Sequence, residues 1–446
     1  MSQSIKAYIC AVALSSMFIN FAAADDMMTT YQLAVKQDPV YQAAVNTYKV
    51  EQARLGIARS TLLPFLDANA STARRGQKVT SADNVTGFDG EANYNVDDWA
   101  VSFNQTLFDI PAWQGYKKAK FNLERAGHDF HSAQQNLIFR VASIYGQALI
   151  AKENLRVSEA ENQALAEQLQ LDKERLKVGL GTVTNLYATE SRYQLAVTNV
   201  VEADFALRDA LQALRELTGQ MPGDLRRIAD DKPPLDPPEP DSMDFWLQTS
   251  LKNNLEYLSA SSTVAVADRE ISRIKGQHLP TLGVVASRSY SDASSSLTGA
   301  GRKREGSNVG LRLVIPLIQG WGVVAGIDEA RSQYQVSLQK QESARRNVDR
   351  TSRSSYQAVK SGISRLKALK SAVKAGKSTV EAKREGFKAG VNTNVEVLDA
   401  VRDLYGSERN YINAKYQFIL STLKLKQVAG KLVLADLERV NGWLGK

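Results

Sequence analysis

The chain has 446 residues and a net charge of +8, from 56 lysines and arginines against 48 aspartates and glutamates. Hydrophobic residues make up 43% and the mean hydropathy is −0.30, which excludes a polytopic helical membrane protein and argues against general disorder. None of the 11 prolines lies between Pro111 and Pro222 or after Pro316, and these two stretches without the strongest helix breaker predict long helices.

The first 24 residues have the features of a secretory signal peptide. Lys6 supplies the positive start, residues 7–21 are apolar, and residues 22–24 form a small-residue cleavage site. An apolar stretch of about 15 residues is too short to span a membrane comfortably, which argues against an N-terminal anchor. The single cysteine, Cys10, lies in this segment, so we expect a mature chain without disulfide or thiol chemistry.

Four short motifs recur in the same order, at offsets between 210 and 216 residues. The pairs are Leu63-Pro64 with Leu279-Pro280, Leu107-Phe108 with Leu317-Ile318, Gly179-Leu180 with Gly390-Val391, and Leu217-Thr218 with Val428-Ala429. One such pair would carry little weight, but four in one order indicate a tandem duplication. The first repeat covers residues 25–220 and the second covers residues 243–430.

Each repeat begins with a helix of about 22 residues, followed by two strands. The first helix is predicted after Asp38, with Pro39 at its start, because proline suits the first position of a helix. Its counterpart is predicted from about 254 to 275. Period-two alternation of apolar and polar residues then predicts strands at about 65–74, 99–108, 281–290 and 308–318. The residues between the strands of each pair, about 75–98 and 291–307, are rich in Gly, Ser, Asn and Asp and are predicted to be loops.

A long helix and a shorter returning helix complete each repeat. The long helices are predicted at about 112–178 and 322–389, and the return helices at about 183–219 and 394–430. At 1.5 Å per residue, each long helix would be roughly 100 Å long. The first helix and the return helix together nearly equal the long helix in length, so they can stack end to end along it.

The remaining segments would cover the seam between the stacked helices. Residues 221–242 hold six prolines and are predicted to form an extended connector without helix. Residues 431–446 are predicted to form a C-terminal equatorial segment at the same level.

An apolar residue recurs at every seventh position of the second long helix. The members are Val359, Leu366, Val373, Val380 and Phe387, and their counterparts in the first repeat are Ala148, Leu155, Asn162, Leu169 and Leu176. Such a stripe predicts a left-handed coiled coil with the returning helix.

The strands combine one apolar face with one polar face, and aromatic residues lie near their ends. With the export signal, this pattern predicts outer-membrane β-strands, although a soluble, half-buried sheet is the alternative. Four strands cannot close a barrel and lipid tolerates no open sheet edge, so the membrane interpretation requires two or three copies. A lumen lined by polar residues would hold water; the candidates are Asp67, Asn69, Asn104, Thr106 and Arg312. The predicted fold is therefore mainly α-helical with a transmembrane β part.

The sequence resembles the TolC-type outer-membrane channel family over nearly its whole mature length. The resemblance rests on the double repeat, the Leu-Pro junctions, and two helix turns. The turns read Arg175-x3-Gly179-Leu180-x4-Asn185-Leu186 and Phe387-Lys388-Ala389-Gly390-Val391-x-Thr393-x2-Glu396-Val397-Leu398-Asp399-Ala400. The resemblance implies a homotrimer with a twelve-stranded β-barrel in outer-membrane lipid, continued by a periplasmic α-helical coiled-coil barrel that is closed at its tip.

The resemblance also implies partners. These are a periplasmic adaptor and an inner-membrane transporter, either an ABC transporter or a proton-driven pump, in drug efflux or type I secretion. The sequence does not distinguish these two roles or identify the substrate.

Two acidic residues near the second turn are candidates for the periplasmic gate. Glu396 and Asp399 share a helix face, and the resemblance implies an acidic, cation-binding ring at the entrance of a trimer. Like charges held close together predict a raised pKa. For Glu396, the alternative is a structural capping box with Thr393.

Other gate positions depart from the family pattern. Phe387 replaces the family's tyrosine, Asn392 its arginine and Asn185 its aspartate, so the family's salt bridge cannot form. Either other contacts hold the tip closed, with Glu174 as a candidate, or the tip is less tightly locked. The hypothesis we favour from the sequence is the looser tip.

The turns match the motifs that contact the adaptor in the family. The docking candidates are Gly179, Leu180, Thr182, Gly390, Val391 and Thr393. The alternative is that the glycines only permit the left-handed residue that ends a helix.

Two other classes of function are disfavoured. No nucleophile, base and oxyanion arrangement is visible, so we predict no enzyme activity and no cofactor. Residues 340–391 hold 14 basic against 4 acidic residues, but an exported protein rarely meets nucleic acid, so a solvated helix face is expected there. A soluble periplasmic coiled-coil scaffold remains the alternative to the channel.

Overall fold

The computed structural model describes residues 26–80, 90–229, 232–296 and 299–445. The predicted signal peptide lies outside these residues. Internal contacts divide the chain into two compact units. One unit contains the sheet and comprises residues 43–133 and 249–350; the other is helical and comprises the rest of the described chain. Each unit therefore takes residues from both repeats.

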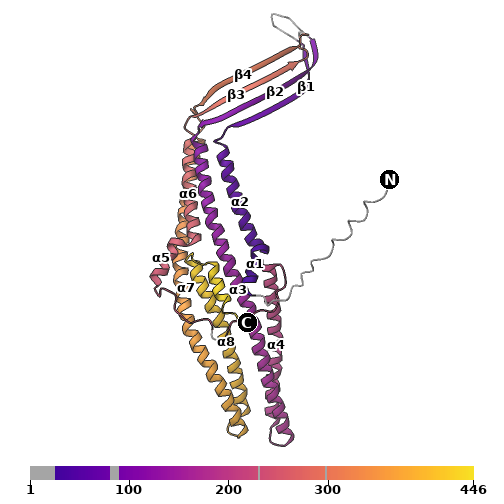
Figure 1. Cartoon of the computed structure of the whole chain (residues 1–446), viewed down its shortest axis with the longest axis vertical. Coiled ribbons are helices and arrows are strands. Elements are labelled where there is room, and N and C mark those ends of the chain that lie inside the picture. The colour runs from indigo at the N-terminus through magenta and orange to yellow at the C-terminus, as the bar shows by residue number, and fades with distance from the viewer. Residues whose placement is uncertain (1–25, 81–89, 230–231, 297–298, 446) are drawn as a thin grey trace, which may run out of the picture. The chain divides into compact units, whose positions relative to one another are not determined.

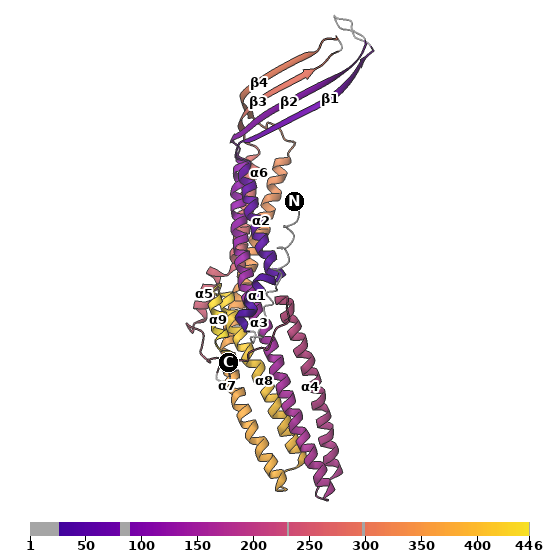
Figure 2. The same cartoon turned by 45° about the vertical axis from the view of Figure 1, so that its right-hand side comes forward.

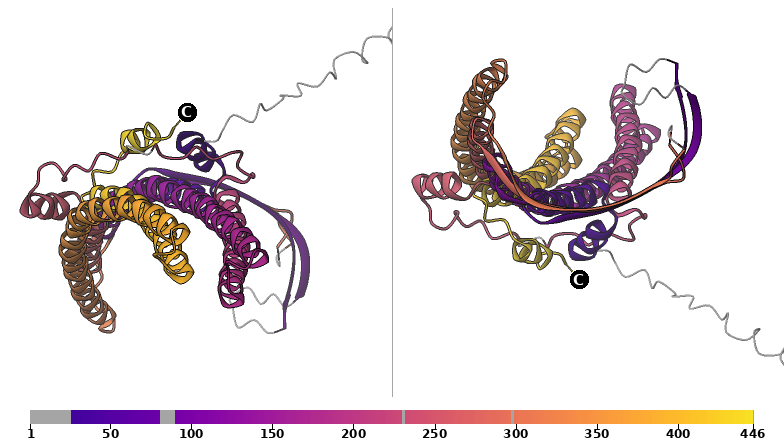
Figure 3. Two further views of the ribbon diagram at one scale, coloured as in Figure 1. Left: turned by 90° about the horizontal axis from the view of Figure 1, so that it is seen from below. Right: turned by 90° about the horizontal axis from the view of Figure 1, so that it is seen from above.

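The sheet unit contains one antiparallel sheet with the strand order β1-β2-β3-β4 (Figure 1). Its strands are β1 (Phe65–Val79), β2 (Gly90–Phe108), β3 (Thr281–Ala293) and β4 (Arg302–Val314). The central β2–β3 pair joins the two repeats, and the sheet is curved rather than flat (Figure 3). Both outer strands, β1 and β4, have an unpaired edge within the described chain.

The strand ends differ from the prediction. Residues 75–79, 90–98, 291–293 and 302–307 are strand, although their polar composition indicated loops. The pairing of β1 with β2 is continuous from Phe65↔Asn104 to Val79↔Gly90. These polar residues are strand because their backbone groups form hydrogen bonds with a partner strand in register. The last strand ends at Val314 instead of residue 318, because its partner strand begins at Thr281 and Pro316 has no N–H to donate.

The register separates the side chains onto two faces. Cross-strand partners share a face, and one row reads Leu66, Phe103, Ala286 and Val309 across the four strands. We call this the apolar face. The opposite, polar face carries all five residues predicted for the lumen, namely Asp67, Asn69, Asn104, Thr106 and Arg312.

Four helices connect to the strands. They are α2 (Pro39–Ser60), α3 (Ile110–Lys177), α6 (Leu255–Gly276) and α7 (Gly322–Lys388). Within the sheet unit, α3 and α6 are joined by Glu270, which accepts a hydrogen bond from Lys118 at 2.9 Å. The rings of Tyr48 and Phe130 stack between α2 and α3 at 5.4 Å. No described helix combines the length and apolar character that a membrane crossing needs.

The helical unit contains two long hairpins (Figure 2). One pairs the end of α3 with α4 (Val183–Thr218), and the other pairs the end of α7 with α8 (Asn394–Val428). Four of the five heptad residues of α7 are buried, with Val359 and Leu366 exposed by 1% and 2%, as expected for a helix interface.

Short helices and the connector pack on the hairpins of this unit. The short helices are α1 (Met27–Gln37), the start of α5 (Met243–Asn253), and α9 (Leu434–Asn441). Met27 donates its main-chain N–H to Asn441 at 2.9 Å, and Ile228 of the connector forms a β-bridge with Leu444. The two ends of the described chain therefore meet beside the connector, in one apolar cluster with the middle of α3.

Candidate functional site at the helix turns

Both hairpin turns reverse the chain through a left-handed glycine. Gly179 and Gly390 have φ angles of 77° and 79°, which a side chain would strain. Each is followed by an apolar residue that is largely exposed, Leu180 at 73% and Val391 at 79%. The glycines thus have the structural role described above, and they also present two apolar side chains to solvent.

The threonines after the turns are helix caps. Thr182 Oγ1 accepts a hydrogen bond from the main-chain N–H of Asn185 at 3.2 Å, and Thr393 Oγ1 accepts one from Glu396 at 3.3 Å. Glu396 Oε2 in turn accepts the N–H of Thr393 at 2.8 Å, which completes the predicted capping box.

The Glu396 carboxylate is held by a lysine as well as by the cap. Lys383 Nζ donates to Oε1 at 2.9 Å, and Asn392 Nδ2 donates to Oε2 at 3.1 Å. The Lys383 ammonium, the Thr393 N–H and the Asn392 amide lower the pKa of Glu396 to about 2. Within one chain these donors favour the charged form, while the expected rise concerns carboxylates of neighbouring copies in a trimer and stays a prediction.

Asp399 also has basic partners, and one of them belongs to the other hairpin. Arg192 of α4 donates to Asp399 Oδ1 at 3.2 Å, and Arg402 lies 3.3 Å from the same oxygen. Both gate carboxylates are thus paired with cations in this chain, which offsets part of the negative field that an acidic ring would produce.

The low pKa of Glu396 predicts a loss of tip stability in strong acid. A carboxylate with a depressed pKa contributes stability above its ordinary pKa of 4.5, and that contribution is lost as the pH falls through the folded value of about 2. Amide-exchange protection around Glu396, corrected for intrinsic rates, should stay level from about pH 7 to 5 and fall between about pH 4 and 2. Glu396→Gln should remove this fall; an equal fall in the variant would contradict the prediction.

The remaining gate candidates behave differently from one another. Phe387 is buried, and the Arg175 guanidinium lies 4.7 Å from its ring centroid, so it links the two hairpins without a hydroxyl. Asn185 accepts a hydrogen bond through its main-chain oxygen from Asn394 of the other hairpin at 3.3 Å. Glu174 is exposed and accepts a hydrogen bond from Gln170 of its own helix, so it does not join the hairpins within the described chain.

A buried cluster that the sequence did not reveal lies beside these residues. We call Gln168, Asp172, Thr189 and Asn394 the tip node; they are exposed by 7%, 4%, 0% and 1%. Asn394 Nδ2 donates to Thr189 Oγ1 at 2.7 Å and to Asp172 Oδ2 at 3.0 Å. Thr189 donates to Asp172 at 2.6 Å, and Gln168 donates to both Asp172 and Asn394. The tip node therefore ties α3 and α4 to α8 through polar contacts.

The available sequence signal for the tip node was weak. Gln168 lies next to Leu169 of the heptad stripe, and Asp172 lies one turn further along α3. These polar residues could equally belong to an exposed helix face, and only the approach of Asn394, 222 residues from Asp172, buries them.

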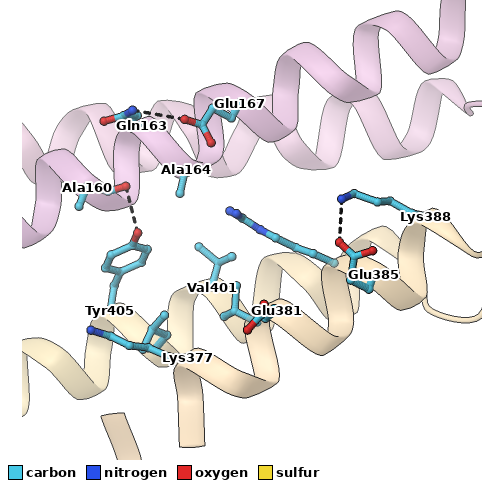
Figure 4. Close-up of a pocket in the computed structure, with 13 residues that line it drawn as sticks. Ala160, Gln163, Ala164, Glu167, Lys377, Glu381, Glu385, Lys388, Val401 and Tyr405 are labelled. Carbon is cyan, nitrogen blue, oxygen red and sulfur yellow. Dashed lines mark hydrogen bonds and ion pairs between the residues drawn. The ribbon is translucent and has the colours of Figure 1, made fainter. Parts of the chain in front are cut away.

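Two further contacts between the hairpins lie farther from the turns than the tip node. Arg409 of α8 donates to Glu161 of α3 at 2.7 Å, and Tyr405 donates its hydroxyl to the Ala160 carbonyl at 3.1 Å. Beside Tyr405, a cleft of about 560 Å³ separates α3 from α7 and is lined by charged residues such as Glu167 and Lys388 (Figure 4). These polar links add to an apolar interface, because Leu165 of α3 and Ala196 of α4 share one buried cluster with Val397 of α8.

No group of three His, Cys, Asp or Glu side chains suited to a metal ion occurs among the described residues. The carboxylates of the candidate site are engaged by lysine, arginine and amide groups, so the arrangement favours polar contacts between helices.

Comparison with known proteins identifies the family and the extent of its match to the chain. The profile described as "Outer membrane efflux protein" matches residues 30–220 and 246–431, which nearly coincide with the two repeats. The chain is 29% identical over 439 residues to "Outer membrane protein TolC" of Escherichia coli (strain K12), covering 96% of this chain and 87% of that protein. It is 28% identical over 416 residues to "Alkaline protease secretion protein AprF" of Pseudomonas aeruginosa, covering 93% and 86%.

Solved structures share the fold at lower identity. A crystal structure of CusC matches with a TM-score of 0.77 at 16% identity, covering 94% of this chain and 95% of that chain. The CmeC outer membrane channel of Campylobacter jejuni matches with a TM-score of 0.78 at 16% identity, covering 94% and 90%. Because the family profile covers both repeats, the chain belongs to the outer membrane efflux protein family.

Proposed function

We propose that the protein is the outer-membrane exit duct of an efflux pump or a type I secretion system, and that it works as a homotrimer. The observation that carries the proposal is the four-stranded sheet, which has one apolar face, one polar face and two open edges. An open edge in lipid leaves backbone groups unpaired, whereas three copies would close a twelve-stranded barrel. The polar face would then line a water-filled lumen, and the helical part would lie in the periplasm.

The named relatives support the assignment to export. They include TolC, AprF and a "Proteases secretion protein PrtF" that is 28% identical over 440 residues. We infer from them that this chain works with a periplasmic adaptor and an inner-membrane transporter. The exposed Leu180 and Val391 at the hairpin turns are the surface we assign to the adaptor.

The same turns are the proposed gate. The tip node, the Arg192–Asp399 pair and the Arg175–Phe387 contact all join the first hairpin to the second. Separating the hairpins would break all three contacts. We propose that opening of the tip is this separation.

The oligomer can be tested directly. The full chain should partition with outer membranes and have the mass of three copies in mild detergent, and it should form channels in planar bilayers. A monomer in the soluble periplasmic fraction would reject the duct and favour the soluble scaffold.

Replacing both gate acids should weaken cation selectivity. In Glu396→Ala with Asp399→Ala, the trimer loses six carboxylates near its axis, so the cation-to-anion permeability ratio should fall about two- to threefold. Block by trivalent cations should weaken in parallel. Asp403→Ala with Glu385→Ala, which removes equal charge from exposed positions near the turn, is the control. Selectivity equal to that of the control would reject the acidic ring.

A further inference from the structure

Basic residues gather at the same end of both open edges of the sheet. Arg74, Arg75 and Lys78 lie late in β1, and residues 302–304, Arg-Lys-Arg, begin β4. The register places them at one end, since Ala73 pairs with Val96, Val96 with Ala293, and Ala293 with Arg302. We call these six residues the edge basic cluster.

Acidic residues at this end lie mainly on the two inner strands. Glu91, Asp97 and Asp98 belong to β2, and Asp292 belongs to β3. Lys303 is paired with Asp292 at 3.1 Å. The other five members of the edge basic cluster are exposed and form no ion pair with a described residue. Lys78 lies opposite Glu91 in the register, so the positive charge without an acidic residue directly opposite is that of the four arginines.

The cluster lies just beyond the apolar band of the sheet. Trp99 and Tyr290 stack at 6.1 Å on the apolar face, and the next row on that face is charged, with Asp97, Asp292 and Lys303. Aromatic side chains mark the boundary between hydrocarbon and headgroups. The strands join the helices at their other end, so the edge basic cluster belongs at the outer surface of the outer membrane.

The cluster is divided between the two faces. By register, Arg74, Lys78 and Lys303 lie on the apolar face with Trp99, and Arg75, Arg302 and Arg304 lie on the polar face. In a barrel, the first three would face lipid headgroups and the last three would face the lumen. This division provides a test of what the charges bind.

Closing the barrel brings the two edges together, and this step rests on the proposed trimer. An antiparallel seam places the start of β4 beside the end of β1 from the next copy. Like charges opposite one another on paired strands are destabilising. The one acidic residue at this end of either edge strand, Glu305, lies 3.6 Å from Arg288. The two edge strands therefore offer each other no unpaired acidic residue at the seam.

We propose that phosphorylated glycolipid headgroups of the outer leaflet bind at the three seams and supply a counter-charge. Arginine and lysine form charge-assisted hydrogen bonds with phosphate oxygens, and a headgroup with two phosphates can contact both edges at once. The ligand is a lipid because Arg74, Lys78 and Lys303 share a face with the aromatic pair.

Native mass spectrometry of the full-length trimer tests the proposal. The probes are a bisphosphorylated lipid A-type glycolipid, its dephosphorylated form and soluble tripolyphosphate. We expect up to three phosphorylated glycolipids per trimer, bound about tenfold more tightly than the dephosphorylated form. R74Q/K78Q/K303Q should lose this preference. R75Q/R302Q/R304Q, which removes equal charge from the same ends of the same strands, should keep it.

The outcomes separate the alternatives. No preference for the phosphorylated lipid, or equal loss in the two triple variants, would overturn the proposal. Tripolyphosphate binding as strong as lipid binding would also overturn it, by identifying a soluble polyanion as the ligand. Spectra recorded without lipid give the number of chains in the complex. A failure of the proposed trimer is therefore recognised independently of a failure of lipid binding.

Discussion

Replacing Asn394 with alanine is expected to loosen the periplasmic tip. The change removes hydrogen bonds to Asp172 and Thr189, and it leaves both groups buried with fewer partners. A buried polar group that loses its partner costs about 1–3 kcal/mol, so the local opening free energy should fall by about 3 kcal/mol. Amide exchange near residues 168–172 should accelerate about a hundredfold, and single-channel recordings should show a higher resting conductance.

The matched control for Asn394→Ala is Gln170→Ala. Gln170 lies on α3 between two residues of the tip node, but it is exposed and bonds to Glu174 of its own helix. Its loss should change the opening free energy by less than about 0.5 kcal/mol. Equal conductance in the two variants would reject the tip node as a gate contact.

The same recordings address the looser tip predicted from the sequence. Phe387, Asn392 and Asn185 cannot form the family's salt bridge, and that loss predicts a higher resting conductance than in a relative with the bridge. The tip node supplies the alternative, namely other contacts that could hold the tip closed. A wild-type conductance as low as that of such a relative would reject the looser tip and favour closure by the tip node.

Replacing Arg409 with methionine should destabilise the contact between the hairpins above the tip. Glu161 is 5% exposed and would keep a buried charge without its partner. Removing one member of a buried ion pair costs about 3–5 kcal/mol, and the partial exposure of Arg409 favours the lower value, about 3 kcal/mol. The change should appear as faster amide exchange around residues 157–165 and a lower melting temperature of the trimer.

The double variant Glu161→Met with Arg409→Met provides the control. Two apolar side chains of similar volume replace the pair without leaving a charge, so most of the lost stability should return. If the double variant were as unstable as Arg409→Met alone, the loss would come from packing rather than from the unpaired carboxylate.

Local signals determined much of this fold from the sequence. The glycine turns, the threonine caps and the prolines fix the helix ends, since they act within one turn of the chain. The capping box of Thr393 and Glu396 is confirmed for the same reason. The apolar stripe on α7 also predicted the buried residues, because heptad spacing alone places them on one side of the helix.

The strands were predicted less well because their extent depends on partners. Residues 75–79 and 90–98 are polar and were expected to be loops, but mutual pairing makes them strand. A strand with polar residues on both faces has no periodic signal, and only the ladder defines its end.

The contacts between the hairpins were decided by tertiary structure alone. The pairs Asp172–Asn394 and Arg192–Asp399 join residues more than 200 positions apart, one from each repeat. The sequence determined the duplicated helices and the position of each turn, because those signals are local. It did not determine which polar side chains become buried between the repeats, since burial and pKa depend on the neighbour that packing brings. For Glu396 that neighbour is Lys383, whose ammonium lowers the pKa of the carboxylate within one chain.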